Sequence, residues 1–426
     1  MVVLSSPVTV ELALTRCCNH QCVHCYNPYR PKNDLRSCRS IDDLKIIMDQ
    51  LQKNKVLKVV ITGGEPLTDK ELTIEAVKML ISLGIEVSLN TNLTLINQTF
   101  IDNLKAVDED ICLFVSIPSL NCNSYDLITN NSHGYSDVLR GLQLCLDNDL
   151  KVGINIVVTK LTEYDFQSIS ELLEKYPNIV YVSLSPVVPP EYDFDNNLFK
   201  ITNEDLLLIR DILLQLNDKY KIPVGSSIPL PICIIGTELY RRGHSSTCCA
   251  GRTDCAIDFE SGDIFACSGS NESFGNVYEQ GLESSWINMS KWRDESLIAQ
   301  ECKKCKYLPL CSGKCRMMTM HNTGYVTNPE INLDLQNLFN QKPIMDYSAK
   351  YSLNTSLKTR EEEFGVVLFL NNGHLFGSKK IYSNIQIMKQ LGKFSLEDLS
   401  TFIKLDENFL DLFNIFCMLR YVVESE

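Results

Sequence analysis

Strand-like and helix-like segments alternate along the first half of this 426-residue chain. Consecutive strands that are joined through helices pair in parallel. The strand-like runs are 7–15, 57–62, 86–91, 112–117, 153–159 and 179–187, and the helical stretches between them are 40–53, 68–83, 97–106, 136–147 and 163–175. Right-handed crossovers curl such a sheet, and six units are fewer than the eight of a closed barrel. We therefore expect an α/β fold, a partial (β/α)6 TIM-like barrel, with its chemistry at the C-terminal ends of the strands.

Residues typical of helix ends support these boundaries. Ser40 is expected to cap the first helix, because its hydroxyl can accept a hydrogen bond from an unpaired backbone N–H. Thr68 and Glu71 have the spacing of a capping box for the second helix, and Gly84 is expected to end it.

The alternation stops after a further helix at about 203–217. Residues 236–325 are rich in Gly, Cys and short turns, so bound metal is expected to replace part of the hydrophobic core there. From about residue 351 the pattern indicates a small α+β module, with strands at 354–358, 364–370 and 374–379 and helices at 382–391, 395–403 and 407–421. We expect three domains, 1–235, 236–345 and 346–426.

The chain has a formal net charge of -13 and 18 cysteines. The acidic balance argues against nucleic acid or an anionic membrane as the main partner. Because no signal-peptide pattern or long apolar run is present, we expect a cytoplasmic protein, whose cysteines would bind metal rather than form disulfides. Twelve cysteines fall in three groups, within 17–25, 248–267 and 302–315; the other six are read as small buried hydrophobic residues (Cys38, Cys112, Cys122, Cys145, Cys233 and Cys417).

The first group contains Cys18, Cys22 and Cys25, with the spacing C-x3-C-x2-C, directly after the first strand. Three thiolates on one short loop can hold three irons of a cubane and leave the fourth iron open to a small molecule. The alternative is a zinc loop, which needs a fourth ligand such as Cys17, His20 or His24.

The sequence Gly63-Gly64-Glu65-Pro66 ends the second strand. Glycines permit close backbone approach to a ligand, and Glu65 offers a carboxylate to an ammonium group. An ordinary turn before a helix is the plainer interpretation. At the same rim as the cysteine loop, a clamp for an amino acid explains the segment better.

Over roughly residues 8–235, these motifs resemble the radical SAM superfamily. The resemblance implies that Cys18, Cys22 and Cys25 hold a [4Fe–4S] cluster and that S-adenosylmethionine (SAM) chelates its unique iron. Gly63, Gly64 and Glu65 would contact SAM, and so would Tyr26 and polar residues at later strand ends: Asn90, Ser116, Asn155 and Ser185. One departure is His24, where the family usually has an aromatic residue. Reductive cleavage of SAM would give a 5′-deoxyadenosyl radical that abstracts hydrogen from the substrate, with flavodoxin or ferredoxin as the reductant.

The other two cysteine groups resemble the SPASM extension, which carries one or two auxiliary [4Fe–4S] clusters, so that two or three clusters are implied in all. One would be held by Cys249, Cys255, Cys267 and Cys315, with Cys248 as the alternative to Cys249; the other would be held by Cys302, Cys305 and Cys311. A zinc ribbon is the alternative for a C-x2-C pair. The family's last downstream cysteine is missing, so this cluster is expected to have another ligand, an open iron or low stability; the candidate ligands are His321, Glu330 and Asp334.

Residues 346–426 resemble the PqqD-like, winged-helix-like elements that recognise the leader of a ribosomally made precursor peptide. Such elements bind the leader as an added strand at a sheet edge beside an apolar helix. Here the edge would be about His374 to Ser378, with Leu375, Phe376 and Phe413 as contacts. The bland alternative is a small stabilising domain.

These resemblances together predict a peptide maturase that forms a crosslink, with a thioether as the first choice of product. The rivals are a formylglycine-generating sulfatase maturase, a peptide epimerase, and a non-catalytic iron–sulfur or zinc module. The sequence assigns no catalytic base.

Overall fold

The computed structural model describes residues 3–27, 39–190, 197–242, 247–294, 296–320, 347–370, 373–418 and 420–424. The chain forms two compact units, one of residues Ser6–Asp334 and one that joins Met1–Ser5 to Leu335–Glu426. In the described ranges, no helix is long and apolar enough to cross a membrane. Cys38, His321, Glu330 and Asp334 lie outside the described residues.

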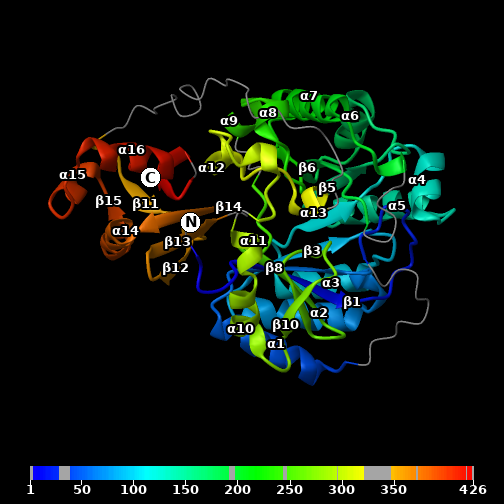
Figure 1. The fold of residues 1–426 in the computed structure, drawn as a ribbon, viewed down its shortest axis with the longest axis horizontal. Coiled ribbons are helices and arrows are strands. Elements are labelled where there is room, and N and C mark those ends of the chain that lie inside the picture. Colours follow the sequence, from blue (N-terminus) through cyan, green and yellow to red (C-terminus); the bar gives the residue numbers. More distant parts are fainter. Residues whose placement is uncertain are drawn as a thin grey trace. The chain divides into compact units, whose positions relative to one another are not determined.

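Six parallel strands form the centre of the larger unit, as the sequence predicts (Figure 1). They neighbour one another in chain order: β1 (Thr9–Thr15), β2 (Lys58–Gly63), β3 (Glu86–Thr91), β4 (Leu113–Ser116), β5 (Val152–Val158) and β6 (Ile179–Pro186). The crossovers contain α1 (Ile41–Lys53), α2 (Lys70–Ser82), α3 (Gln98–Val107), α4 (Cys122–Thr129), α5 (Gly134–Asp147) and α6 (Phe166–Lys175), and α7 (Asn203–Tyr220) follows β6. This chain order is that of a (β/α)6 unit.

The structure tests the caps that were predicted for α1 and α2. Ser40 caps α1 in a capping box with Asp43, as expected. The capping box predicted for Thr68 is wrong, because a short 3-10 helix, η1 (Pro66–Thr68), precedes α2 and places Asp69 at its N-cap. Gly84, with φ of +70°, follows the end of α2 and donates its N–H to the Ile81 carbonyl, as a helix-ending glycine does.

The cysteine-rich segment extends the same sheet instead of forming a separate unit. Strand β8 (Asp254–Asp258) pairs in parallel with β1, while β9 (Asp263–Phe265) and β10 (Ser273–Asn276) continue antiparallel beyond it; β7 (Val224–Gly225) pairs with β6 at the opposite edge. The predicted boundary between residues 235 and 236 therefore falls inside one compact unit. The remaining short helices of this unit are η2 (Asn197–Phe199), α8 (Ile232–Ile235), α9 (Glu238–Arg241), α10 (Gly281–Asn288), α11 (Ser290–Arg293), η3 (Gln300–Cys302), α12 (Leu308–Cys311) and α13 (Arg316–Met320).

The smaller unit contains two antiparallel three-stranded sheets. One has the order β12 (Lys358–Glu362), β13 (Gly365–Leu370), β14 (Gly373–Ser378); the other has the order β15 (Lys393–Phe394), β11 (Tyr351–Leu353), β16 (Val422–Glu424). Its helices are α14 (Lys379–Leu391), α15 (Leu396–Ser400) and α16 (Glu407–Met418), near the predicted positions. The strand predicted at 354–358 is wrong, since β12 begins at Lys358, and the second sheet was not predicted. Val366, Leu368 and Phe413 belong to the core of this unit.

Candidate functional site

The first cysteine group lies on a loop that leaves β1 and is anchored to the end of α4. Gln21 and Val23 donate backbone hydrogen bonds to the Thr129 and Ile128 carbonyls, at 2.9 and 2.8 Å. The Cys25 N–H bonds to the Cys22 carbonyl at 3.1 Å. Cys18, which is solvent-exposed in the described chain, receives the His20 N–H on its sulfur at 3.4 Å. The three thiols of the C-x3-C-x2-C motif are thus carried on one fixed turn.

The two glycines after β2 allow the chain to pack directly against this cysteine loop. The Gly64 N–H bonds to the Thr15 carbonyl at 2.6 Å, and the Glu65 N–H bonds to the Cys17 carbonyl at 2.7 Å. A Cβ atom on Gly64 would lie 2.0 Å from the Cys17 oxygen, and one on Gly63 would lie 2.3 Å from the Thr15 oxygen. Both glycines are therefore required by backbone contact, in addition to any contact with a ligand.

Glu65 is buried, with 1% of its surface exposed, beside the cysteine loop. Its carboxylate accepts hydrogen bonds from the Leu67 N–H at 3.0 Å, the Thr91 hydroxyl at 2.6 Å and the Asn92 N–H at 2.7 Å. Burial raises the pKa of this carboxyl, and the three hydrogen bonds lower it in part. A cation beside the carboxylate would offset the cost of burial, so the geometry fits an ammonium ligand.

Thr91, the last residue of β3, and the residues that follow it were not predicted from the sequence, where Asn90 was named in this segment. The Asn92 amide donates to Asn19 Oδ1 at 2.9 Å, and the Asn19 amide donates to the Thr94 hydroxyl at 2.8 Å. These bonds tie the third strand end to the cysteine loop. The available signal was the polar run Asn90-Thr91-Asn92 directly after an apolar strand.

The predicted polar residues at later strand ends share one face of the sheet. Ser116 pairs with Asn155, and Asn155 pairs with Ser183. Ser185 lies two residues after Ser183 in the same strand and therefore points to the same face. Asn90 pairs with Phe114, two residues before Ser116, and so lies on this face as well. The Ser185 hydroxyl donates to Asn155 Oδ1 at 2.8 Å. Residues of the opposite face, such as Val115, Ile154 and Leu184, have no exposed surface.

A cavity on this polar face connects the first loop to the cysteine-rich segment. Its lining includes Glu11, Tyr26, Thr62, Asp258 and Ser268. Tyr26 forms a hydrogen bond with the Thr62 side chain. Burial, followed by the nearby Glu11, Cys25 and Cys267, raises the pKa of Tyr26. Burial raises the pKa of Glu11, whose carboxyl bonds to the Ser268 side chain. Glu11 was also missed, although a charged residue within the strand Thr9–Thr15 was a visible signal.

The second cysteine group is only partly brought together. Burial is the main cause that raises the pKa of Cys267, and the neighbouring Cys315, Glu11 and Cys248 raise it further. Burial and the neighbouring Cys248 raise the pKa of Cys315 to about 12. Cys248, Cys267 and Cys315 therefore lie near one another. Cys249 bonds to the Thr247 carbonyl at 3.6 Å. Cys255 pairs in register with Val10, on the apolar face of the sheet, so the structure favours Cys248 over Cys255 as a neighbour of Cys267.

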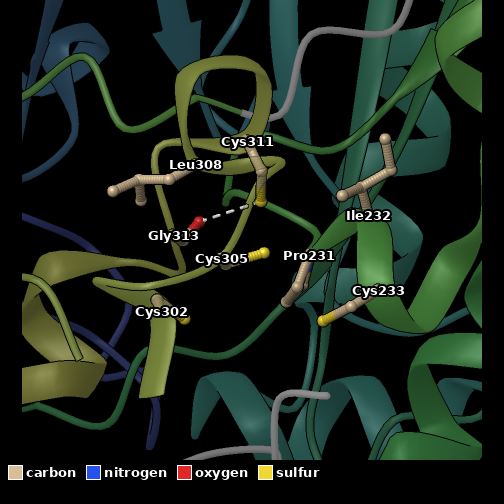
Figure 2. A pocket seen from close by; sticks show the side chains of 8 residues that line it. All are labelled: Pro231, Ile232, Cys233, Cys302, Cys305, Leu308, Cys311 and Gly313. Atoms are coloured by element: carbon tan, nitrogen blue, oxygen red, sulfur yellow. Dashed lines mark hydrogen bonds between the residues drawn. The ribbon is translucent and has the colours of Figure 1, made fainter. Parts of the chain in front are cut away.

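The third group, Cys302, Cys305 and Cys311, lines a pocket with short turns on one side (Figure 2). The Cys305 N–H bonds to the Cys302 carbonyl at 3.0 Å, and the Cys311 thiol donates to the Gly313 carbonyl at 3.3 Å. Buried thiols must lose their protons to bind metal, which requires compensating positive charge nearby.

Two guanidinium groups lie among the auxiliary cysteines. Arg252 donates to the Ser312 hydroxyl at 2.6 Å, and Arg316, which is 2% exposed, donates to the Ser312 carbonyl. Burial and the nearby Arg316 lower the pKa of Arg252. Buried cations beside several thiols suit an anionic iron–sulfur cluster, because net charge is one of the properties that such sites adjust.

In the described ranges, no three His, Cys, Asp or Glu side chains converge on the position of one metal ion. This observation concerns mononuclear sites, in which sulfur ligands lie at about 2.3 Å from a single zinc. A cubane binds its cysteines through separate irons and spreads them further apart.

Residues 12–173 match the family model of the radical SAM superfamily. This protein is a radical SAM enzyme. It is 23% identical to the AdoMet-dependent heme synthase of Methanosarcina barkeri, over 75% of this chain and 94% of that protein, and 25% identical to the mycofactocin maturase MftC of Mycobacterium tuberculosis, over 73% and 79%. The fold resembles that of Streptococcus suis SuiB bound to its precursor peptide SuiA, with a TM-score of 0.56 at 20% identity, over 78% of this chain and 76% of that one.

The radical SAM enzyme uses SAM and [4Fe–4S] chemistry, which supplies the electron and the carbon radical that start the reaction. Cys18, Cys22 and Cys25 would hold the cluster, and Glu65 would receive the amino group of SAM. Thr91 and Asn92 keep the Glu65 carboxylate in place, and the polar sheet face borders a cavity.

The residues predicted to bind a leader lie in the smaller unit and behave differently from one another. Phe376 in β14 is 38% exposed, and Leu375 is half-buried against the core. Phe413 is 1% exposed and packs edge-on against Tyr351 at 5.2 Å between ring centres. The prediction that Phe413 is a surface contact for a leader is wrong, because α16 directs this side chain into the core.

Proposed function

We propose that this radical SAM enzyme is a maturase of a ribosomally synthesised precursor peptide. In this proposal the smaller unit binds the leader, the larger unit holds two or three [4Fe–4S] clusters, and SAM chemistry abstracts hydrogen from a core-peptide residue. A crosslink is the proposed product, and a thioether from a cysteine thiol to carbon is the first to test. Flavodoxin or ferredoxin would supply the electrons.

The position of β14 supports leader binding more than any other observation. Within the described sheet β14 pairs only with β13, so its second edge can accept an added strand. Phe376 packs against His374 at 5.2 Å and edge-on against Phe364 at 6.3 Å, which gives this edge an aromatic surface. Main-chain bonds would give affinity, and these rings would give selectivity.

The relationship to MftC supports a peptide substrate, since that relative is named as a maturase and aligns over most of its length. A crosslink removes two hydrogens from the peptide, so a second electron must leave after the first hydrogen is abstracted. An auxiliary cluster held by Cys267, which lies near Tyr26 and directly before Ser268 in the cavity lining, is a suitable acceptor.

The test is anaerobic incubation with SAM, reductant and candidate precursor peptides encoded beside the gene, followed by mass spectrometry. Loss of two hydrogens from the peptide without a new aldehyde, with formation of 5′-deoxyadenosine, would support a crosslink. Conversion of a Cys or Ser to an aldehyde would favour the sulfatase-maturase rival, and an unchanged mass with an inverted centre would favour an epimerase.

A tetrapyrrole-modifying enzyme is the second candidate. The observation that favours it is the alignment with the heme synthase, which covers 94% of that protein. The same assay with an iron porphyrin in place of peptide separates the two, because only one class of substrate should stimulate SAM cleavage. Turnover of porphyrin without peptide binding would overturn the maturase proposal.

A further inference from the structure

The pocket in Figure 2 brings a fourth cysteine to the third cysteine group. Cys233 lies on α8, in a part of the chain far before Cys302, Cys305 and Cys311, yet the four side chains line one pocket. We infer that Cys233 is the fourth protein ligand of an iron–sulfur cluster held by Cys302, Cys305 and Cys311. This inference concerns the cluster alone and does not depend on whether the substrate is a peptide.

The third group lacks a ligand within its own segment. Its spacing, C-x2-C-x5-C, supplies three thiolates, whereas a cubane bound only by protein needs four. Cys315 follows, but it groups with Cys267 and Cys248. Past Cys315 the only cysteine is Cys417, which belongs to the smaller unit. A ligand from an earlier part of the chain is therefore needed if the site is closed by cysteine.

The local structure of α8 explains why Cys233 faces this pocket. Pro231 forms the N-cap, and Gly236, with φ of +73°, ends the helix after one turn. Ile232 and Ile235 are buried and fix one side of that turn in the core. Cys233 is only half-buried, and Figure 2 shows its sulfur directed into the pocket, on the side opposite Cys302.

A direct contact joins this turn to the third group. The backbone N–H of Ile232 bonds to the Cys311 thiol, which places the residue before Cys233 against a proposed ligand. Backbone N–H groups that point at ligand sulfurs are a usual feature of iron–sulfur sites and adjust their potentials. Pro231 and Ile232 also line the pocket, so the turn forms one of its walls.

The position of Cys233 differs from that of a cysteine that only fills the core. Cys145, for example, has no exposed surface and lies within α5. Cys233 instead has part of its surface in a pocket whose other polar groups include three thiols. The reading of Cys233 as a small hydrophobic residue therefore does not fit its surroundings.

The test compares iron, sulfide and electron paramagnetic resonance spectra of the full-length protein after anaerobic reconstitution. Cys305→Ala removes a proposed ligand from within the third group and sets the expected loss, while Cys122→Ala, at an exposed cysteine in α4, is the matched control. We expect Cys233→Ala to behave like Cys305→Ala, with about four irons fewer per chain or the signal of a three-iron cluster. Iron content and spectra equal to those of Cys122→Ala would overturn the inference.

Cys233→Ser keeps the test decisive if the alanine variant folds poorly. Serine preserves the side-chain volume and can bind iron through oxygen, so the iron count should stay near that of the unmodified protein. The spectrum and midpoint potential of one cluster should shift, because oxygen replaces sulfur at one iron. An unshifted potential in a protein with normal circular dichroism would show that the fourth ligand comes from elsewhere, such as His321, Glu330 or Asp334. Because no substrate is added, failure here leaves the maturase proposal intact.

Discussion

Thr91 donates a hydrogen bond of 2.6 Å to the Glu65 carboxylate, so that the end of β3 holds the acidic residue that follows β2. The same carboxylate accepts the Asn92 N–H at 2.7 Å. These contacts fix the carboxylate beside the first cysteine loop, and preorganisation of this kind reduces the cost of binding.

Glu65→Gln should weaken SAM binding by about 10- to 100-fold, since a hydrogen bond to a charged group is worth about 1.5–3 kcal/mol. The amide cannot neutralise an ammonium, although its size is preserved. Equilibrium binding of SAM to the reconstituted protein measures the effect. Glu71→Gln, on the exposed side of α2, is the control. Unchanged affinity and unchanged 5′-deoxyadenosine formation in Glu65→Gln would place the SAM site elsewhere.

Replacing Cys18, Cys22 and Cys25 together by alanine should remove about four irons per chain and abolish SAM cleavage. The auxiliary cysteines are untouched, so the remaining iron should persist. Iron analysis and 5′-deoxyadenosine assays are the measurements, and Cys17→Ala is the control on the same loop. A protein that contains zinc and no iron after anaerobic purification would contradict this expectation.

Gly64→Ala should loosen the first cysteine loop even though it removes no ligand. The new Cβ would lie 2.0 Å from the Cys17 oxygen. Overpacking of this kind lowers the free energy of unfolding by about 1–3 kcal/mol. We expect faster loss of iron from the first cluster during gel filtration and a lower melting temperature. Gly84→Ala, where a Cβ meets nothing within 4 Å but φ is +70°, should also lower the melting temperature and therefore serves as the comparison for iron retention only. Equal iron retention in both variants would show that the loop can move aside.

Phe376→Ala should weaken precursor binding by about 5- to 30-fold, the loss of 1–2 kcal/mol typical of an important interface residue. Phe402→Ala is a matched control, because Phe402 is 62% exposed in the same unit but lies outside the β12–β14 sheet. Binding of fluorescent leader peptide to the full-length protein measures the difference. Similar affinities for the two variants would remove the β14 edge from the proposal.

Leu375→Pro should abolish leader binding more completely, because proline lacks the N–H that a paired strand requires. Circular dichroism is needed to exclude unfolding of the unit. The full chain is used because Ser5 donates its N–H to Glu362 in β12 at 3.0 Å, so a fragment beginning near residue 346 lacks part of this unit. Wild-type affinity in a folded Leu375→Pro protein would mean that the leader binds at another surface.

Local signals were sufficient for much of the larger unit. The six parallel strands and the helices between them follow from short-range hydrophobic patterns, and the loop of Cys18, Cys22 and Cys25 follows from spacing. The start of α2 was predicted too early, because Thr68, which resembles a cap, belongs to the 3-10 helix η1. The strand predicted at 354–358 failed because pattern alone does not fix where a short strand begins.

The sequence by itself determined the parallel α/β sheet, the grouping of three cysteines on the first loop and the place of Glu65 after the second strand, because each depends on residues close together in the chain. The tertiary structure decided which distant residues meet. It paired β8 with β1, grouped Cys248 with Cys267 and Cys315, turned Phe413 into a core, and brought Cys233 to the pocket of Cys302. Spacing fixes ligands only within a turn or two, whereas contacts across the chain depend on strand order, register and the way short helices pack, which no local pattern records.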